Sequence, residues 1–332
     1  MYTLGIDTSN YTTSAAIVDE DENIIYDNRK LLEVKKGERG LRQQEALFQH
    51  TKNLPVLLSE VLNEHTRSKI GAVAVSTRPR SVEGSYMPCF LAGRAAAVSI
   101  ASALGVPCFE FSHQEGHIAA VAPSKIDDFL CYHLSGGTSE LLEVHIRHED
   151  KPAPGHQDGN MLRIDTSIIG ATKDISAGQL LDRIGVEMGC GFPSGSAMDK
   201  IAYSSENEPP CDLLTGIRLD GLDFSLSGIE NQFLMRLKDN LDNKDMQKRL
   251  VGELFKRLSV MLVKLTEKAR KQTGLRDVVF TGGVSSSKYL RKYLNKNLKY
   301  IYFGDHSSDN AVGTSILGSR NHLIRSEKQR TV

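Results

Sequence analysis

The stretch YTLGIDTSNYTTSAAIV, residues 2–18, decides the fold class. Two apolar runs flank a turn made of Asp, Thr, Ser and Asn, and a third apolar run, IIY, follows at residues 24–26. Apolar runs broken by clusters of small polar residues are typical of short strands joined by tight hairpins. The chain is therefore predicted to begin with three consecutive strands.

A similar series returns about one domain later. The apolar run FLCYHL at 129–134 is followed by the turn SGGTS at 135–139 and by apolar runs at 140–146 and 161–164. A spacing of this size is too long for a solenoid repeat, so duplication of one α/β unit is the economical explanation. The elements expected around the two sets of strands are helices at 42–65, 90–104, 179–188 and 245–273 and strands at 72–76 and 277–280, with a basic helix after the last strand.

Composition excludes several classes of protein. The 332 residues are 40% hydrophobic and 25% charged, with 41 basic and 41 acidic side chains, so the net charge gives no steering towards a polyanion. The five cysteines are scattered and never spaced C-x-x-C, which argues against a disulfide framework or a zinc ribbon. Neither a signal peptide nor a membrane-spanning run is expected, so the prediction is a cytoplasmic protein without membrane contact.

The run FSHQEGH, residues 111–117, carries the first candidate chemistry. His113 and His117 are four residues apart, so on a helix they share one face and both can reach one metal ion. The alternative is a pair of surface histidines near a helix start. The glutamate, Glu115, is not at the position of the zincin motif, and a peptidase is therefore not favoured.

A possible third ligand lies near the C-terminus. In SSDNAVG, residues 307–313, Asp309 stands in a loop of small residues that enters a helix. Taken alone, such an aspartate is more often a helix cap. Combined with the histidine pair, it completes a set of two imidazoles and one carboxylate. Such a set with open positions suits one divalent transition metal, iron(II) in preference or zinc.

Two glycine-rich turns predict a nucleotide site. SGGTSE at 135–140 and GGVSSS at 282–287 each follow a strand, and their backbone N–H groups can bind phosphate or a nucleoside. Asp182, on the helix expected at 179–188, can accept hydrogen bonds from ribose, and GFPSG at 191–195 allows close approach of the same nucleoside. The alternatives are ordinary hairpin turns and a solvated helix acid.

These motifs, in this order, resemble the glycoprotease-like family of tRNA threonylcarbamoyladenosine synthases. Besides those already quoted, the resemblance rests on GIDTS at 5–9, on the segment from Asp174 to Asp182 and on DFSLSG at 223–228. It implies an α/β, duplicated actin-like ATPase (ribonuclease H-like) fold with two lobes and a central cleft. The implied lobes are 1–120, 121–305 with helical insertions, and a segment 306–332 returning to the first lobe.

The resemblance also implies an activity and its machinery. The family transfers a threonylcarbamoyl group from its adenylate to the adenosine beside the anticodon of tRNA. The metal ligands would be His113, His117 and Asp309. The residues binding adenylate, ATP or substrate would be Leu134, Ser135, Gly136, Gly137, Thr138, Asp174, Asp182, Gly195, Asp199, Gly282, Gly283 and Ser287. The expected partners are tRNA, a paralogous actin-like protein and a small ATPase, and a homodimer is possible.

The chain departs from the family pattern around the expected adenylate. Thr138 replaces a histidine, Ile175 an aspartate, Glu230 a lysine and Ser287 an asparagine, and the loop 77–82 lacks the usual G-P-G. Three hypotheses therefore stay open. They are tRNA threonylcarbamoyl transfer, a related carbamoyl or acyl transferase acting on another acceptor, and a noncatalytic nucleotide-binding scaffold. Basic runs near 29–42 and 288–299 are compatible with tRNA but are equally typical of solvated surfaces.

Overall fold

The structure, a computed structural model, describes residues 1–9, 11–34, 41–81, 84–148, 162–205, 212–304 and 311–330. The chain divides into two compact units. The first unit comprises Met1–Pro123, His145–Asp165 and Ser308–Val332, and the second comprises Ser124–Val144 and Thr166–Ser307. The expected division at 120 and 305 would instead place His145–Asp165 with the second lobe.

The first unit is built on a five-stranded sheet with the strand order β3-β2-β1-β4-β5. The three N-terminal strands pair antiparallel as hairpins, whereas β4 pairs parallel with both β1 and β5. The strands are β1 (Tyr2–Asp7), β2 (Thr12–Asp19), β3 (Ile24–Leu31), β4 (Ile70–Arg78) and β5 (Cys108–Ser112). The helices are α1 (Gln43–Val61), α2 (Phe90–Leu104), α3 (His113–Ala119) and α9 (Val312–Arg330).

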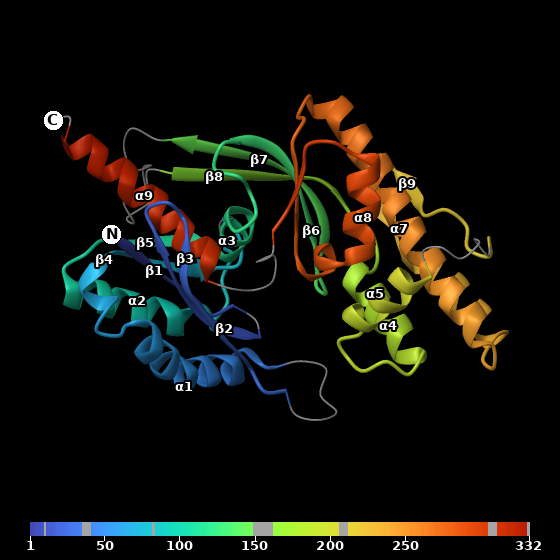
Figure 1. Cartoon of the computed structure of the whole chain (residues 1–332), viewed down its shortest axis with the longest axis horizontal. Helices are drawn as coiled ribbons and strands as arrows, with labels where there is room; N and C mark the ends of the chain where they lie inside the picture. Colours follow the sequence, from blue (N-terminus) through green and yellow to red (C-terminus); the bar gives the residue numbers. More distant parts are fainter. Residues whose placement is uncertain are drawn as a thin grey trace. The chain divides into compact units, whose positions relative to one another are not determined.

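Helices cover both faces of this sheet (Figure 1). Side chains of a strand alternate between faces, and β2 shows the consequence. Ala15 and Ile17 pack with α1 and α2, whereas Ala16 and Val18 pack with α9. A strand buried on both sides needs a continuous apolar run, which is the run AAIV at 15–18. Gly5 of β1 allows α9 to approach, because an added Cβ would collide with Ala311 and Ser315.

The second sheet has the strand order β12-β11-β6-β7-β8. Its central strand β6 runs parallel to β11, and β11 runs parallel to β12. The strands are β6 (Asp128–Leu134), β7 (Ser139–His148), β8 (Leu162–Ala171), β11 (Val278–Thr281) and β12 (Ile301–Phe303), and β9 (Arg218–Asp220) and β10 (Asp223–Ser225) form a separate hairpin. The helices are α4 (Ala177–Glu187), α5 (Gly195–Ser204), α6 (Ser227–Lys238), α7 (Lys244–Thr273) and α8 (Lys288–Asn297).

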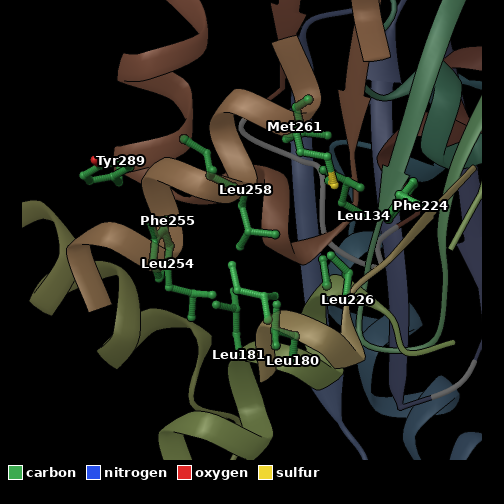
Figure 2. Close-up of a cluster of buried hydrophobic side chains, with 14 of the residues drawn as sticks. Leu134, Leu180, Leu181, Phe224, Leu226, Leu254, Phe255, Leu258, Met261 and Tyr289 are labelled. Carbon is green, nitrogen blue, oxygen red and sulfur yellow. The ribbon is translucent and has the colours of Figure 1, made fainter. Parts of the chain in front are cut away.

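The long helix α7 organises the core of the second unit. Its residues Leu254, Leu258 and Met261 follow a helical spacing of four and three and are buried. They pack in one apolar cluster with Leu180 and Leu181 of α4, as Figure 2 shows. This cluster fixes α4 against the sheet and thereby fixes the loops at the ends of β6 and β11.

The sequence-based elements compare well with these helices and strands. The helix predicted at 90–104 is confirmed as α2, and those at 179–188 and 245–273 correspond to α4 and α7. The helix predicted at 42–65 ends earlier, at Val61, because Asn63 begins a turn in which its side chain accepts from the His65 N–H at 2.9 Å. Helices α5 and α6 were not predicted. No helix in the described ranges is long and apolar enough to span a bilayer.

Candidate active site

The histidine pair lies on the short helix α3, which begins at His113. Ser112 caps this helix by accepting from the Glu115 N–H at 3.2 Å, and the Glu115 carboxylate accepts from the Ser112 N–H at 2.6 Å. This reciprocal capping box occupies Glu115, which also accepts from the Ser81 hydroxyl at 2.6 Å. Glu115 is therefore a structural residue here and not a candidate general base.

The two imidazoles converge as the spacing predicts. The Nε2 atoms of His113 and His117 are 2.8 Å apart, and the ring centroids are separated by 4.3 Å at an interplanar angle of 74°. His117 is buried, with 6% of its surface exposed, and the His113 side chain is 15% exposed. The two rings thus face each other through their Nε2 atoms, within the first unit.

Asp7, at the end of β1, orients the first of these rings. It is fully buried, and its Oδ2 atom lies 3.3 Å from His113 Nδ1. The same carboxylate accepts from the Ser9 hydroxyl at 2.7 Å and from the Ser76 hydroxyl of β4. Burial by itself would raise the pKa of Asp7. The charge of His113 and the hydrogen bonds from His113, Ser76 and Ser9 outweigh it, so the pKa lies below the usual value.

The histidine pair supplies two nitrogen atoms of the kind that transition metals bind. An imidazole whose Nδ1–H is bound to a carboxylate keeps the lone pair on Nε2, which is the tautomer that binds metal ions. Among the described residues, no group of three or more His, Cys, Asp or Glu side chains is arranged to hold a metal ion. Asp7 faces the other nitrogen of His113, and Asp309, the predicted third ligand, lies outside the described residues.

The two glycine-rich turns are neighbours in the second unit. The turn 135–138 follows β6 and Gly282–Gly283 follows β11. Thr281, the last residue of β11, pairs with His133, one residue before the end of β6. Nothing lies within 4 Å of a Cβ added to Gly136, Gly137 or Gly283, so one side of each turn is open. The two turns therefore lie at the same edge of one sheet.

Helix α4 starts directly against the first turn. The Ser176 hydroxyl donates to the Gly136 carbonyl at 2.8 Å, and the Gly178 N–H donates to the Ser135 carbonyl at 3.1 Å. Gly178 has no room for a Cβ because the backbone of Ser135 and Gly136 would collide with it. Likewise, Gly282 has a φ of 85° and packs its α-carbon against the carbonyl of the buried Leu134. Close backbone contacts therefore hold both turns rigidly.

The three predicted carboxylates each accept backbone N–H groups within the second unit. Asp174 accepts from Ile175 at 2.7 Å, Leu226 at 2.8 Å and Ser227 at 3.0 Å. Burial by itself would raise its pKa, but these bonds and that of the Ser227 hydroxyl lower the pKa of Asp174 to about 2. Asp174 thus joins the loop before α4 to the start of α6.

Asp182 and Asp199 stabilise other loops. Asp182 accepts from the Ser194 N–H at 2.7 Å and so holds the loop before Gly195, the first residue of α5. Asp199 accepts from the Lys288 N–H at 3.0 Å, the Tyr289 N–H at 3.1 Å and the hydroxyl of Ser287. The structure therefore brings Asp199 and Ser287, which are far apart in sequence, into direct contact at the start of α8.

Comparison with known proteins identifies the family of the chain. The sequence profile of the tRNA N6-adenosine threonylcarbamoyltransferase family matches residues 25–153 and 158–313. The chain belongs to this family. It is 28% identical to the Thermus thermophilus tRNA N6-adenosine threonylcarbamoyltransferase over 97% of this chain and 93% of that protein. It is 30% identical to the Streptococcus mutans protein of the same name over 90% of this chain and 85% of that protein. The predicted family, and with it the assignment to transferase enzymes, is confirmed.

Solved structures confirm the fold of this family member. The activator of 2-hydroxyisocaproyl-CoA dehydratase from Clostridium difficile, with bound ADPNP, matches all of this chain and 98% of its own at a TM-score of 0.52 and 16% identity. Component A of the Acidaminococcus fermentans (R)-2-hydroxyglutaryl-CoA dehydratase matches 97% of this chain and 99% of its own, at a TM-score of 0.54 and 14% identity. At such identities the likeness concerns the fold alone, and the predicted actin-like ATPase fold is confirmed.

The positions at which this threonylcarbamoyltransferase family member departs from the family pattern have local structural partners. Glu230 is 7% exposed, and its carboxylate lies 3.5 Å from the guanidinium of Arg183 on α4. Ile175 is buried in the core, and Ser287 caps α8 by accepting from the Leu290 N–H at 3.1 Å. The Thr138 hydroxyl lies 3.3 Å from that of Ser135 within the turn. Each departure is thus accommodated by its own surroundings.

Sequence reasoning missed one member of the histidine site. Asp7 lies 106 positions before His113, and nothing in the local pattern of GIDTS marks it as a partner of a histidine. Only the order of the strands in the sheet could have indicated this partner. Asp7 ends β1, which is separated from β5 by β4 alone, and β5 leads into His113. Polar residues at the ends of neighbouring parallel strands meet at one sheet edge.

Proposed function

We propose that this chain transfers a threonylcarbamoyl group from its adenylate to the exocyclic amine of the adenosine beside the anticodon of tRNA. The names of its relatives support this activity. The structural observation that carries it is the short distance of 2.8 Å between the Nε2 atoms of His113 and His117. Asp7 orients the His113 ring through its other nitrogen, Nδ1. Two imidazole nitrogens that face one point support metal-assisted chemistry, because imidazole nitrogen is a common ligand of transition metals.

The reaction exchanges one acyl bond for another. The lone pair of the adenosine N6 attacks the carbamoyl carbonyl carbon, and a C–N bond forms. The C–O bond of the carbamoyl–phosphate anhydride breaks, and AMP leaves with that electron pair while the amine loses a proton. No covalent enzyme intermediate is required, because the donor is already activated.

One set of residues would bind the metal, and another set would bind the nucleotide. A divalent transition metal, iron(II) or zinc, would be held by His113, His117 and Asp309 and would supply Lewis-acid polarisation of the donor carbonyl. Asp7 keeps the proton of His113 on Nδ1 and so keeps Nε2 available. The open backbone of the 135–138 and 282–283 turns would bind the adenylate and stabilise the charge that the leaving phosphate develops.

Partners follow from the same proposal. The acceptor would be tRNA, met by a local surface because the net charge of the chain is zero. A paralogous actin-like protein and a small ATPase would assist, and a homodimer is the alternative assembly. A cytoplasmic location fits this acceptor.

A second candidate rests on a specific observation. Glu230 faces Arg183, and Ser287 is bound by Asp199, so two positions near the predicted nucleotide site are committed to internal contacts. This favours, as the alternative, a carbamoyl or acyl transferase with the same donor chemistry and another acceptor. A noncatalytic scaffold would be the outcome if neither a nucleotide nor a donor binds.

Nucleoside analysis of tRNA tests the proposal. A deletion strain should lose threonylcarbamoyladenosine, and a plasmid carrying the wild-type chain should restore it. The His113→Ala variant should not restore it, whereas His65→Ala, which alters an exposed histidine on the turn after α1, should. Full modification with His113→Ala would contradict the proposed site.

A purified system separates the two transferase hypotheses. Labelled threonylcarbamoyl adenylate is supplied with tRNA, the metal and any paralogous partner, and both AMP and labelled tRNA are measured. Transfer of label into tRNA supports the first hypothesis. Release of AMP without labelled tRNA supports the second.

A further inference from the structure

A loop with two arginines is attached to the helix that carries the histidine pair. Arg78 is the last residue of β4, and Pro79 and Arg80 follow it. In the parallel pairing of β4 with β5, Arg78 lies opposite Ser112, the residue before His113. All of these residues belong to the first unit.

Hydrogen bonds fix this loop onto the first turn of α3. The Gln114 N–H donates to the Pro79 carbonyl at 3.1 Å. The Ser81 hydroxyl lies 2.6 Å from a carboxylate oxygen of Glu115 and 3.2 Å from the Ser112 hydroxyl. The residues on both sides of Arg80 are therefore bound to the residues that flank His113.

Arg78 is partly buried in this loop without a carboxylate partner among the described residues. Its guanidinium makes a contact of 3.4 Å with the Thr77 hydroxyl, a neutral group. A guanidinium carries five donors in a planar fork, and shielding it from water is favourable only when an anion or several acceptors replace that water. One weak neutral contact does not satisfy this requirement.

The carboxylates nearest in the hydrogen-bond network are already committed. Glu115 accepts from the Ser112 N–H and the Ser81 hydroxyl. Asp7 is bound to His113, Ser9 and Ser76. Neither of these two carboxylates therefore complements Arg78, and its fork stays available for the anion of a ligand.

We propose that Arg78 binds an oxyanion, a carboxylate or a phosphate, of the ligand that is taken up beside the His113–His117 pair. The planar fork of arginine matches both groups in bidentate geometry. This inference rests on the proposed function for the identity of the ligand, because a threonylcarbamoyl adenylate carries a carboxylate on one part and a phosphate on the other. The side chain would then act as a specificity-determining residue for an anionic donor.

Isothermal calorimetry on the full chain tests the inference with two separate probes. N-carbamoyl-L-threonine offers a carboxylate without a phosphate, and inorganic phosphate offers the reverse. Wild-type protein is expected to bind one of them, and Arg78→Gln should lower that affinity by about ten- to a hundredfold, the range of a charge-assisted hydrogen bond. The probe that responds identifies the source of the oxyanion.

A matched variant controls for general charge effects. Arg94→Gln removes another arginine of the first unit, which forms an ion pair with Glu110 at 2.7 Å. Its affinity for both probes should equal that of wild type, and an equal loss in this variant would overturn the assignment to Arg78. Should Arg78→Gln fail to fold, Arg78→Lys replaces it. That variant keeps the charge but not the fork, so a several-fold loss supports the inference and an unchanged affinity overturns it.

The outcomes also separate this inference from the proposed function. If neither probe binds to wild-type protein, or if both bind equally to Arg78→Gln, the inference is wrong even when the wild-type protein modifies tRNA. If a probe binds through Arg78 but no label reaches tRNA, the inference holds and the proposed acceptor is wrong.

Discussion

Replacement of Asp174 by alanine tests whether this carboxylate is a helix cap or a nucleotide ligand. The resemblance to the family predicts a role in nucleotide binding, but the structure gives both oxygens internal donors. Oδ1 accepts from Ile175 and Leu226 and Oδ2 from the N–H and hydroxyl of Ser227. We therefore expect Asp174→Ala to lower the stability of the second unit and to leave nucleotide affinity close to that of wild type.

The size of the effect follows from the shifted pKa and from the lost bonds. A shift from 3.8 to about 2 corresponds to roughly 2.5 kcal/mol at neutral pH, as an upper limit. Asp174 is exposed on its outer side, so solvent screening reduces this figure. Loss of a capping carboxylate costs about 1–2 kcal/mol in comparable helices, and we expect that range here. The thermal midpoint should fall by a few degrees.

The pH dependence has a defined direction. Because the folded pKa of Asp174 is depressed, its contribution to stability is fully present above the unfolded value of 3.8 and is lost as the pH falls through about 2. The difference in unfolding free energy between wild type and Asp174→Ala should therefore be constant above about pH 5 and should shrink between pH 4 and pH 2. Urea unfolding at several pH values measures it. An Asp174→Ala protein with wild-type stability and strongly reduced affinity for AMP would refute the capping argument.

Three further predictions concern the other sites. His113→Ala should abolish binding of a transition metal in a chelator competition, and full metal occupancy in this variant would contradict the site. Asp7→Asn should weaken the metal affinity by about ten- to a hundredfold because the ring loses its orienting acceptor, and an unchanged affinity would contradict that role. Asp182→Ala should weaken AMP binding by about 1–3 kcal/mol in calorimetry, and an unchanged affinity would limit Asp182 to holding its loop. Glu230→Lys should destabilise the chain by about 1–3 kcal/mol because it places a second cation beside Arg183, and the exchange Arg183→Glu with Glu230→Lys should recover part of the loss in thermal unfolding. Equal stability of the single and the double variant would show that the pair is not coupled.

The Glu230 result bears on any attempt to restore the family pattern. Changing Glu230 to lysine and Ser287 to asparagine would recreate two family residues but would break contacts that this chain has built. Ser287 binds Asp199, and Glu230 binds Arg183 on a different helix. A loss of activity in such a variant must therefore be compared with its stability before it is attributed to the pocket.

Most secondary structure could be predicted because it depends on local pattern. The apolar runs at 2–18 predict the hairpins of the first sheet, and the alanine-rich run at 90–104 predicts α2. Helix α5 was not predicted because the glycines and the proline at 191–195 are typical of loops. The helix nevertheless begins at the last of these residues, Gly195. The terminal loop around Asp309 stays a prediction because it lies outside the described residues.

The sequence by itself singled out the candidate site residues. Four-residue spacing places His113 and His117 on one helical face, and glycines after strands mark the two turns. Only the tertiary structure decided what these residues contact. Asp7 meets His113 because β1, β4 and β5 are adjacent in one sheet, and Asp199 meets Ser287 because α5 and α8 pack together. Such contacts join residues about a hundred positions apart, and the order in which strands and helices pack, not the local pattern, fixes them.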